Sequence, residues 1–415
     1  KATLFYALSG KARTAGTAFS QAANEFLQHM KDLLFFDASK RSKGYDHVEL
    51  WINDDVRRSE TFSCVASFGK AMSAVAEALV TACQEIVGYL EDVEGAAEVQ
   101  REIASIAMEL KDTMHAAEVI FERPSDSYVY SATLNRKNDK ANDLLEASLV
   151  NVGEKLEQTL YADTHSVVFA SATLAVDGSF AAFQTALGLN TGENTRCAER
   201  KLDSSYDYDE HMAIYVVNDI PEPNEPGYLQ ALQKLLVDAH RAQRGSMLTL
   251  FTNRREMEKC FEVVQPELKA DDLRLVCQKW GVSVKGLRDD FLADEHLSLF
   301  ALKSFWEGFD APGATLKGVI IPKLPFAKPT DPLSCERAQR DDQAWRRYVL
   351  PAAVLETKQA AGRLIRKADD EGVLILADKR LVTKSYGRAF LNSLPSRNIK
   401  ICSTSEIVKD LAQSC

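Results

Sequence analysis

The sequence lacks several features that would assign it to a common class. Its eight cysteines include no Cys-x-x-Cys pair, so neither a zinc knuckle nor a disulfide framework is predicted. No apolar run approaches the ~18–20 residues that cross a bilayer, and the first segment has no charged-then-apolar signal pattern. The composition therefore predicts a cytoplasmic protein with no membrane segment, whose cysteines are mostly small core residues.

A general excess of positive charge is also missing. The formal net charge of −10 at pH 7 argues against a protein that coats nucleic acid by bulk attraction. Between Phe305 and Lys367, however, there are eleven Lys or Arg residues and seven Asp or Glu residues, a local balance of 11 − 7 = +4. This concentration of basic residues leaves room for a local groove that binds nucleic acid.

No complete phosphate-binding loop is present. A Walker A loop needs Gly, four further residues and then Gly-Lys-Ser/Thr, because its backbone N–H groups wrap the phosphates. Both Gly-Lys pairs, which end at Lys11 and Lys70, are followed by Ala. Asp294-Glu295-His296 looks like a damaged DEAH box, but it follows a predicted helix and lacks the Ala. We interpret it as a surface turn.

The chain has the size and composition of a globular protein with several domains. At 415 residues it suggests two or three units of the usual ~100–200 residues. The apolar fraction of 46% and the charged fraction of 27% are ordinary for folded proteins. Because the chain starts at Lys1, with neither an initiator Met nor a leader-like segment, we expect it to be a piece of a longer polypeptide.

Long amphipathic helices are predicted from about residue 15 to residue 122. Apolar residues recur there at spacings of three and four in three stripes, at 19–33, 72–87 and 103–114. Three such stripes need one another for burial, so we predict an antiparallel helical bundle. Residues 47–52 alternate weakly, as a strand or a loop between the first two helices would.

After Pro124, short β-branched runs alternate with amphipathic stretches. The predicted strands are 167–170, 213–217, 247–251, 273–277, 297–302, 318–322, 373–377 and 399–402. The predicted helices are 227–242, 255–264, 336–350, 353–365 and 381–394. Strand and helix in alternation predict an α/β fold whose mostly parallel sheet is covered on both faces, with ligands at the carboxyl ends of the strands.

The strongest chemical signal is Gln359-Ala-Ala-Gly-Arg-Leu-Ile-Arg366, on a predicted helix. Gln359, Arg363 and Arg366 stand at i, i+4 and i+7, so their polar ends are expected on one face, with Gly362 removing bulk beside them. Arginine suits forked recognition of phosphate better than lysine does. The pattern predicts a polyanion clamp, and a solvated basic stripe is the alternative.

Two polar loops follow predicted strands. In residues 304–313, Gly308 permits close backbone approach, while Glu307 and Asp310 can take a ribose hydroxyl, an arginine or a metal-bound water. A tight turn with buried aromatic side chains is the alternative. In the proline-rich loop that follows the strand at 318–322, Lys323 and Lys328 flank apolar residues, an arrangement that could cradle a sugar-phosphate backbone beside a base.

Short hydroxyl side chains occur at Ser171-Ala172-Thr173-Leu174, after the predicted strand at 167–170. Such groups can pass hydrogen bonds from a nucleotide site to its neighbour. An identical tetrapeptide at 131–134 shows how easily the match arises by chance. Only the second copy follows an uninterrupted apolar run.

Together and in this order, these residues closely resemble the DinG/XPD family of superfamily 2 DNA helicases, from about Tyr128 to Pro395. Residues 305–313 look like motif V, 359–366 like motif VI, 171–174 like motif III and 245–253 like motif IV. The loop at 323–332 and the tripeptide Asp378-Lys379-Arg380 closely resemble sequences that are characteristic of this family.

The resemblance implies roles for individual residues. Arg363 and Arg366 would be arginine fingers that reach the γ-phosphate of ATP, with Gln359 beside them. Glu307, Gly308, Asp310 and Gly362 would lie at the nucleotide, and Ser171 and Thr173 would couple the two motor domains. The residues expected along single-stranded DNA are Thr252, Asn253, Arg255, Lys323 and Lys328.

The resemblance also implies an organisation. It suggests a helical Arch-like domain at 1–125, a connector and first-motor-domain remnant with motif III at 126–176, and a second RecA-like motor domain at 177–415. ATP and Mg²⁺ would act in the intact enzyme, with single-stranded DNA and the first motor domain of the same polypeptide as partners. No iron–sulfur cluster and no other metal site is expected in this chain. The rival hypothesis is a non-catalytic helicase-like module that binds nucleic acid or protein.

Overall fold

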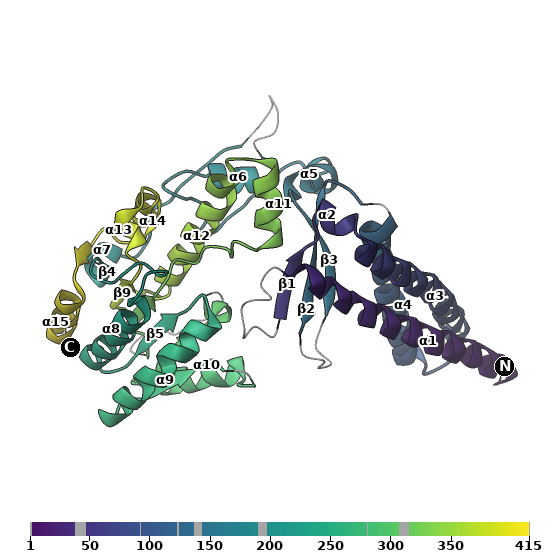
Figure 1. The fold of residues 1–415 in the computed structure, drawn as a ribbon, viewed down its shortest axis with the longest axis horizontal. Helices are drawn as coiled ribbons and strands as arrows, with labels where there is room; N and C mark the ends of the chain where they lie inside the picture. The colour runs from purple at the N-terminus through teal and green to yellow at the C-terminus, as the bar shows by residue number, and fades with distance from the viewer. Residues whose placement is uncertain are drawn as a thin grey trace. The chain divides into compact units, whose positions relative to one another are not determined.

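The computed structural model describes residues 2–37, 47–91, 93–122, 124–136, 143–189, 197–279, 281–306 and 315–414. The chain divides into two compact units (Figure 1). Unit 1 comprises Lys1–Lys155 and Lys328–Ala344, and unit 2 comprises Leu156–Ala327 and Trp345–Cys415. Each unit has its own hydrophobic core.

Unit 1 is built on three long helices. Its helical elements are α1 (Ala2–Met30), η1 (Lys31–Phe36), α2 (Asp54–Arg57), α3 (Glu60–Leu90), α4 (Ala97–Ala117), η3 (Glu118–Glu122), α5 (Val152–Leu156) and α11 (Pro332–Arg340). α3 packs against both α1 and α4. Its N-terminus is capped by Ser59, whose hydroxyl accepts a hydrogen bond from the Phe62 N–H. The predicted N-terminal helical region is therefore confirmed.

The helix α3 is long and apolar enough, by length and composition, to cross a membrane. A core helix of a soluble protein passes the same test, so one such helix is weak evidence for a span. Its apolar stripe contributes Val65, Met72, Ala76 and Val80 to the core of unit 1. Only 28% of its apolar window is buried.

A three-stranded antiparallel sheet, β1-β2-β3, completes unit 1. Its strands are β1 (His47–Trp51), β2 (Tyr128–Asn135) and β3 (Leu144–Leu149). α11 lies against β1 and β2, and the Trp51 indole N–H donates to Glu336 Oε2 at 2.9 Å. The structure thus divides the chain differently from the expected boundaries at 125 and 176. The N-terminal region is not all-helical, because its apolar faces are closed by a sheet and by α11 from far along the chain.

Unit 2 contains a seven-stranded parallel sheet in the order β10-β4-β9-β8-β5-β7-β6. The strands are β4 (Met212–Val217), β5 (Met247–Leu250), β6 (Leu275–Cys277), β7 (Ser298–Ala301), β8 (Gly318–Ile321), β9 (Gly372–Leu376) and β10 (Ile399–Cys402). All seven were predicted from runs of apolar residues, which are typical of strands buried on both faces.

Helices cover both faces of this sheet. One face packs on α8 (Tyr228–Gln243), α9 (Arg254–Ala270) and α15 (Thr404–Ser414), and the other on α10 (Val284–Ala293), α12 (Leu350–Ala361) and α14 (Gly387–Ser393). The remaining helical elements are η4 (Glu157–Tyr161), α6 (Ala181–Ala186), α7 (Tyr208–His211), η5 (Lys303–Phe305), η7 (Trp345–Val349) and α13 (Arg380–Thr383). The α/β class with a RecA-like parallel sheet is confirmed.

Four predicted elements differ from the structure, one of which is the helix predicted at 353–365, since α12 ends at Ala361. Residues 167–170 form no strand and belong to neither sheet, and Val168 is 87% exposed. The sheet of unit 2 ends at β10 and β6 without taking up this segment, and a strand needs a partner edge to satisfy its backbone. The helix predicted at 336–350 is interrupted at Asp341, and the one at 381–394 is interrupted at Lys384, since both residues have extended backbone.

Candidate functional site

A cavity of about 1580 Å³ in unit 2 collects many of the residues singled out from the sequence. Its walls include segments 164–175 and 197–206, the end of α12 with the residues after it, and residues 392–395. The candidate residues on these walls are Ser171, Thr173, Gln359, Gly362, Arg363 and Arg366. The structure therefore brings motif III and motif VI together.

The helix that carries motif VI ends earlier than predicted. α12 stops at Ala361, and Gly362 is its C-cap, with an N–H that donates to the Lys358 carbonyl at 3.0 Å. The prediction that Gln359, Arg363 and Arg366 share one helical face is thus wrong. A turn replaces the helix because the Asp370 carboxylate accepts from the N–H groups of Arg366 and Lys367, at 2.7 and 2.8 Å.

Arg363 is buried, with only 6% of its surface exposed. Its Nε and Nη2 both donate to the main-chain carbonyl of Trp306, the Nε bond measuring 2.9 Å. Trp306 is itself a core residue of unit 2. A buried guanidinium is costly unless it is hydrogen-bonded, so this contact stabilises both groups. It also joins motif VI to motif V.

Arg366 is exposed and lines the cavity, in contrast to Arg363. Its main chain is held on both sides, since its carbonyl accepts from the Tyr206 hydroxyl at 2.8 Å and its N–H donates to Asp370. The backbone is therefore anchored while the side chain stays accessible. A Cβ on Gly362 would meet only ordinary contacts within the chain, so a nucleotide-binding role for Gly362 stays a prediction.

Gln359 and the motif III hydroxyls form a short polar relay. The Gln359 amide Nε2 donates to Thr173 Oγ1 at 3.4 Å, which is a long hydrogen bond. Thr173 Oγ1 lies 3.2 Å from Ser171 Oγ, and the Thr173 N–H donates to the same Ser171 oxygen. These contacts link the end of α12 to segment 164–175 within unit 2.

The cavity is rich in cationic groups that the sequence motifs did not reveal. Lys358 and Lys201 line it, and Arg200 and Arg397 lie on its walls as well. Burial lowers the pKa of the Lys358 ammonium, and the charge of Lys201 lowers it further. Like charges brought together in a partly buried space favour an anionic ligand. Lys358 precedes Gln359 directly, but only the tertiary structure brings Lys201 to it.

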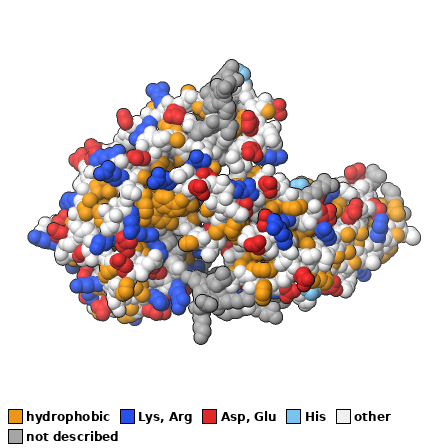
Figure 2. Space-filling model, turned by 45° about the horizontal axis from the view of Figure 1, so that its top comes forward, with side chains coloured by type: hydrophobic (Ala, Val, Ile, Leu, Met, Phe, Trp, Pro, Cys, Tyr) orange, Lys and Arg blue, Asp and Glu red, His pale blue; other side chains and the backbone are white. Residues whose placement is uncertain are grey.

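Three of the predicted nucleotide-binding residues, Glu307, Gly308 and Asp310, lie outside the described residues. For the described ranges, no group of three or more His, Cys, Asp or Glu side chains could hold a metal ion. Two carboxylates, Glu199 and Asp203, also line the cavity, but Lys and Arg side chains outnumber them there, and this excess of positive charge fits a polyphosphate. Figure 2 shows Lys and Arg interspersed with Asp and Glu over the visible face.

A second set of predicted residues lies at the carboxyl ends of β5 and β8, which are neighbours in the sheet. Thr252 and Arg255 are exposed. The Asn253 side-chain oxygen caps α9 by accepting from the Glu256 N–H at 3.2 Å, so Asn253 has a structural task in addition to any ligand contact. Lys323, directly after β8, is partly exposed. Lys328 belongs to unit 1.

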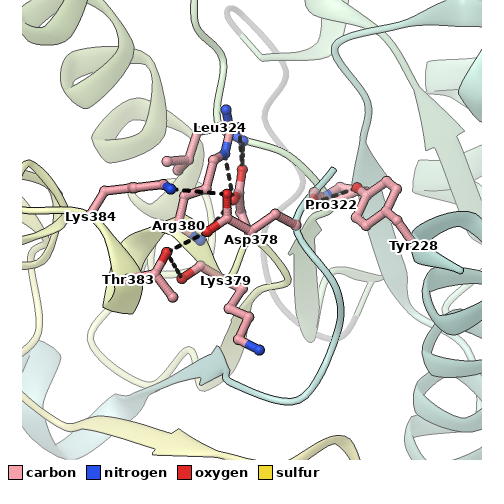
Figure 3. Close-up of polar contacts among 9 residues, drawn as sticks. Tyr228, Pro322, Leu324, Asp378, Lys379, Arg380, Thr383 and Lys384 are labelled. Atoms are coloured by element: carbon pink, nitrogen blue, oxygen red, sulfur yellow. Dashed lines mark hydrogen bonds and ion pairs between the residues drawn. The ribbon is translucent and has the colours of Figure 1, made fainter. Parts of the chain in front are cut away.

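Next to Lys323, the structure contains a buried polar network (Figure 3). The Asp378 carboxylate is 1% exposed and accepts from the Leu324 N–H at 2.9 Å and from the Arg380 Nε at 2.8 Å. On the far side of the loop, the Tyr228 hydroxyl donates to the Pro322 carbonyl at 3.0 Å. Asp378 and Arg380 were noted in the sequence without a role.

Comparison with known proteins shows a similarity to helicases. Residues 236–397 match the family model described as the helicase C-terminal domain. The chain is 34% identical over 278 residues to the ATP-dependent DNA helicase YoaA of Escherichia coli (strain K12), covering 66% of this chain and 41% of that protein. It is 31% identical over 282 residues to the 3'-5' exonuclease DinG of Bacillus subtilis (strain 168), covering 66% and 30%.

Among solved structures, that of S. tokodaii Xpd4 aligns with 95% of this chain and 74% of that chain, with a TM-score of 0.47 and 12% identity. Over about two thirds of its length the chain is therefore similar to a C-terminal portion of DinG- and YoaA-type helicases. It spans less than half the length of the two curated relatives named above.

Proposed function

We propose that this chain is the C-terminal part of an ATP-dependent DNA helicase that unwinds DNA in the 5′ to 3′ direction. It supplies arginine fingers to an ATP molecule held by the first motor domain of the same polypeptide, and it contacts single-stranded DNA. The polarity is taken from the family. The substrate class is supported by the similarity to the ATP-dependent DNA helicase YoaA of Escherichia coli.

The observation that carries this proposal is the convergence of motifs III and VI on one cationic cavity. Arg366, Lys358 and Lys201 line it, and the relay from Gln359 to Thr173 runs along its wall. A site of this charge suits a polyphosphate, and preorganised cations stabilise the charge that develops on a transferred phosphoryl group. Nothing in a purely structural module requires this arrangement.

The two arginines have different tasks in this proposal. Arg366 is exposed on an anchored backbone, so it acts as the finger that approaches the γ-phosphate. Arg363, hydrogen-bonded to the Trp306 carbonyl, maintains the link between motifs V and VI in the described state and reaches phosphate only if that bond is exchanged. Thr252, Arg255 and Lys323 contact the DNA backbone from the ends of β5 and β8.

The test is DNA-stimulated ATP turnover by the protein that contains both motor domains. We expect Arg366→Ala to lower kcat by about 10³-fold or more, as loss of an arginine finger does, with no change in melting temperature. Arg363→Ala is expected to lower both kcat and melting temperature, because it leaves the Trp306 carbonyl without its buried donor. Arg241→Ala, at an exposed ion pair on α8, is the control.

Undiminished DNA-stimulated turnover in Arg366→Ala would contradict the finger role. Retention of DNA binding without any turnover in the unaltered protein would favour the rival function, a non-catalytic module that binds nucleic acid.

A further inference from the structure

The segment after β8 is held on both sides by buried hydrogen bonds. The Pro322 carbonyl accepts from Tyr228 of α8, and two residues later the Leu324 N–H donates to Asp378, which follows β9 (Figure 3). Lys323 lies between these two anchor points. Its backbone is therefore fixed from opposite sides, although it belongs to a loop.

Asp378 is the centre of this arrangement. Besides Leu324, its carboxylate accepts from the Arg380 N–H at 3.1 Å and from the Arg380 guanidinium, which is 17% exposed. Burial works to lower the pKa of the Arg380 guanidinium, but its hydrogen bonds with Asp378 raise it overall. The guanidinium carbon also lies 5.6 Å from the centre of the Phe326 ring. The Asp378–Arg380 pair therefore contacts the loop at Phe326 as well as at Leu324.

The hydrogen-bond network also includes the segment that follows a third strand, β4. The Thr383 hydroxyl of α13 donates to Glu222 at 2.7 Å, and Lys384 forms an ion pair with the same carboxylate at 3.3 Å. Glu222 follows β4, and β4, β9 and β8 are adjacent in the sheet. The ends of three neighbouring strands are thus cross-linked, which gives the loop a rigid frame.

A buried ion pair of this kind calls for an explanation beyond stability. Replacing such a pair with apolar residues is often neutral or stabilising, and in some proteins buried polar groups serve to specify one conformation. Here that conformation is the path of the backbone on both sides of Lys323. The ammonium of Lys323 acts on the Glu256 carboxyl, whose pKa burial raises and Lys323 lowers. Glu256 lies beside Asn253, so Lys323 is placed near the end of β5.

We infer that Asp378 is a positioning residue for single-stranded DNA: through Leu324 and Arg380 it fixes the loop after β8 so that Lys323 meets a backbone phosphate. This inference rests on the proposed function. Asp378 touches no DNA itself. Its effect on binding is therefore expected to pass entirely through Lys323, and that dependence can be measured.

The experiment measures the affinity of the full chain for a fluorescent oligo-dT by anisotropy at several salt concentrations. Loss of one phosphate contact makes the slope of log K against log salt concentration less steep by about 0.7 for a single strand. We expect this change in Lys323→Ala and equally in Asp378→Asn, with no further change in the double variant. Asp410→Asn, which removes a carboxylate from an exposed ion pair, is the control and is expected to keep the original slope.

Tyr228→Phe covers the case in which Asp378→Asn does not fold. It removes only the hydroxyl that holds Pro322, and we expect it to shift the slope in the same direction by a smaller amount. An unchanged slope in Asp378→Asn, or in Tyr228→Phe if the first variant does not fold, would overturn the inference. So would an Asp378→Asn effect that adds fully to that of Lys323→Ala, because it would mean that Asp378 acts elsewhere.

The finger role of Arg366 and the positioning role of Asp378 can be refuted separately. If Lys323→Ala itself leaves the slope unchanged, both the DNA contact and the role of Asp378 are refuted, while the loss of turnover in Arg366→Ala is unaffected. If Arg366→Ala retains full turnover but the slopes change as expected, the finger role is refuted and the positioning role stands.

Discussion

The imidazole of His240 is completely buried in unit 2, between two hydroxyl groups. Its Nδ1 lies 2.9 Å from Ser298 Oγ and its Nε2 lies 3.3 Å from Thr249 Oγ1. Burial lowers the pKa of His240 to about 3. The folded state therefore holds a neutral imidazole at pH values where the unfolded chain, with a pKa near 6.5, takes up a proton.

This difference predicts how stability depends on pH. The contribution of His240 is fully present above about pH 6.5 and is lost as the pH falls below that value towards 3, with a limiting slope of about 1.4 kcal/mol per pH unit. Urea denaturation at pH 7.5, 6 and 5 measures it. The His240→Gln variant is expected to lose this part of the pH dependence, and equal slopes in the two proteins would contradict the assignment.

At the residue scale, the sequence predicted which side chains belong to the candidate site more accurately than it predicted their orientation and burial. Gln359 and Arg366 do line one cavity, and Leu364 and Ile365 are buried. The burial of Arg363 could not be predicted, because it depends on the Trp306 carbonyl, 57 residues away. Lys201 was missed for the same reason, since no local pattern marks a lysine that meets Lys358 only in the folded chain.

At the scale of elements, α11 shows how a short helix is tied to a distant sheet. Glu336 accepts from the Trp51 indole of β1 and pairs with Arg340 one turn along the helix, at 2.7 Å. Arg337 donates from Nη2 to the Val150 carbonyl at 2.8 Å, just after β3. These bonds join α11 to β1 and to the residue after β3; β1 and β3 are the two edge strands of the three-stranded sheet.

We expect Glu336→Ala to lower the free energy of unfolding by about 1–3 kcal/mol, because it leaves the partly buried Trp51 N–H without an acceptor. Chemical denaturation of the variant measures this loss. A double-mutant cycle with Trp51→Phe isolates the bond, and a coupling energy near zero would show that the contact contributes nothing. Glu210→Ala, at an exposed residue of α7, is the matched control.

The limits of sequence-based prediction for elements follow from the same physics. The strands of unit 2 were found because burial on both faces leaves continuous apolar runs, which a reader of the sequence can see. The end of α12 was misplaced because Leu364 and Ile365 continue its apolar pattern, while the turn that stops it depends on Asp370. The segment 167–170 has a strand-like composition but no partner strand.

For the whole molecule, the sequence contains no complete Walker A loop, although its cavity suits a polyphosphate. We therefore predict that the chain by itself shows no measurable ATP turnover, with or without single-stranded DNA. A coupled assay for released phosphate measures it. Turnover well above that of the Arg366→Ala control would contradict the proposed need for the first motor domain.

The insertion of residues 328–344 into unit 1 has a consequence for how the protein is made. Unit 1 is discontinuous, because α11 follows β8 of unit 2 in the chain. Domains usually fold as units during synthesis, starting from the N-terminus. Here β4 to β8 are synthesised before α11, the helix that packs against β1 and β2. Until α11 has been made, part of the sheet of unit 1 is left uncovered. We therefore expect unit 1 to be most prone to misassembly during that interval.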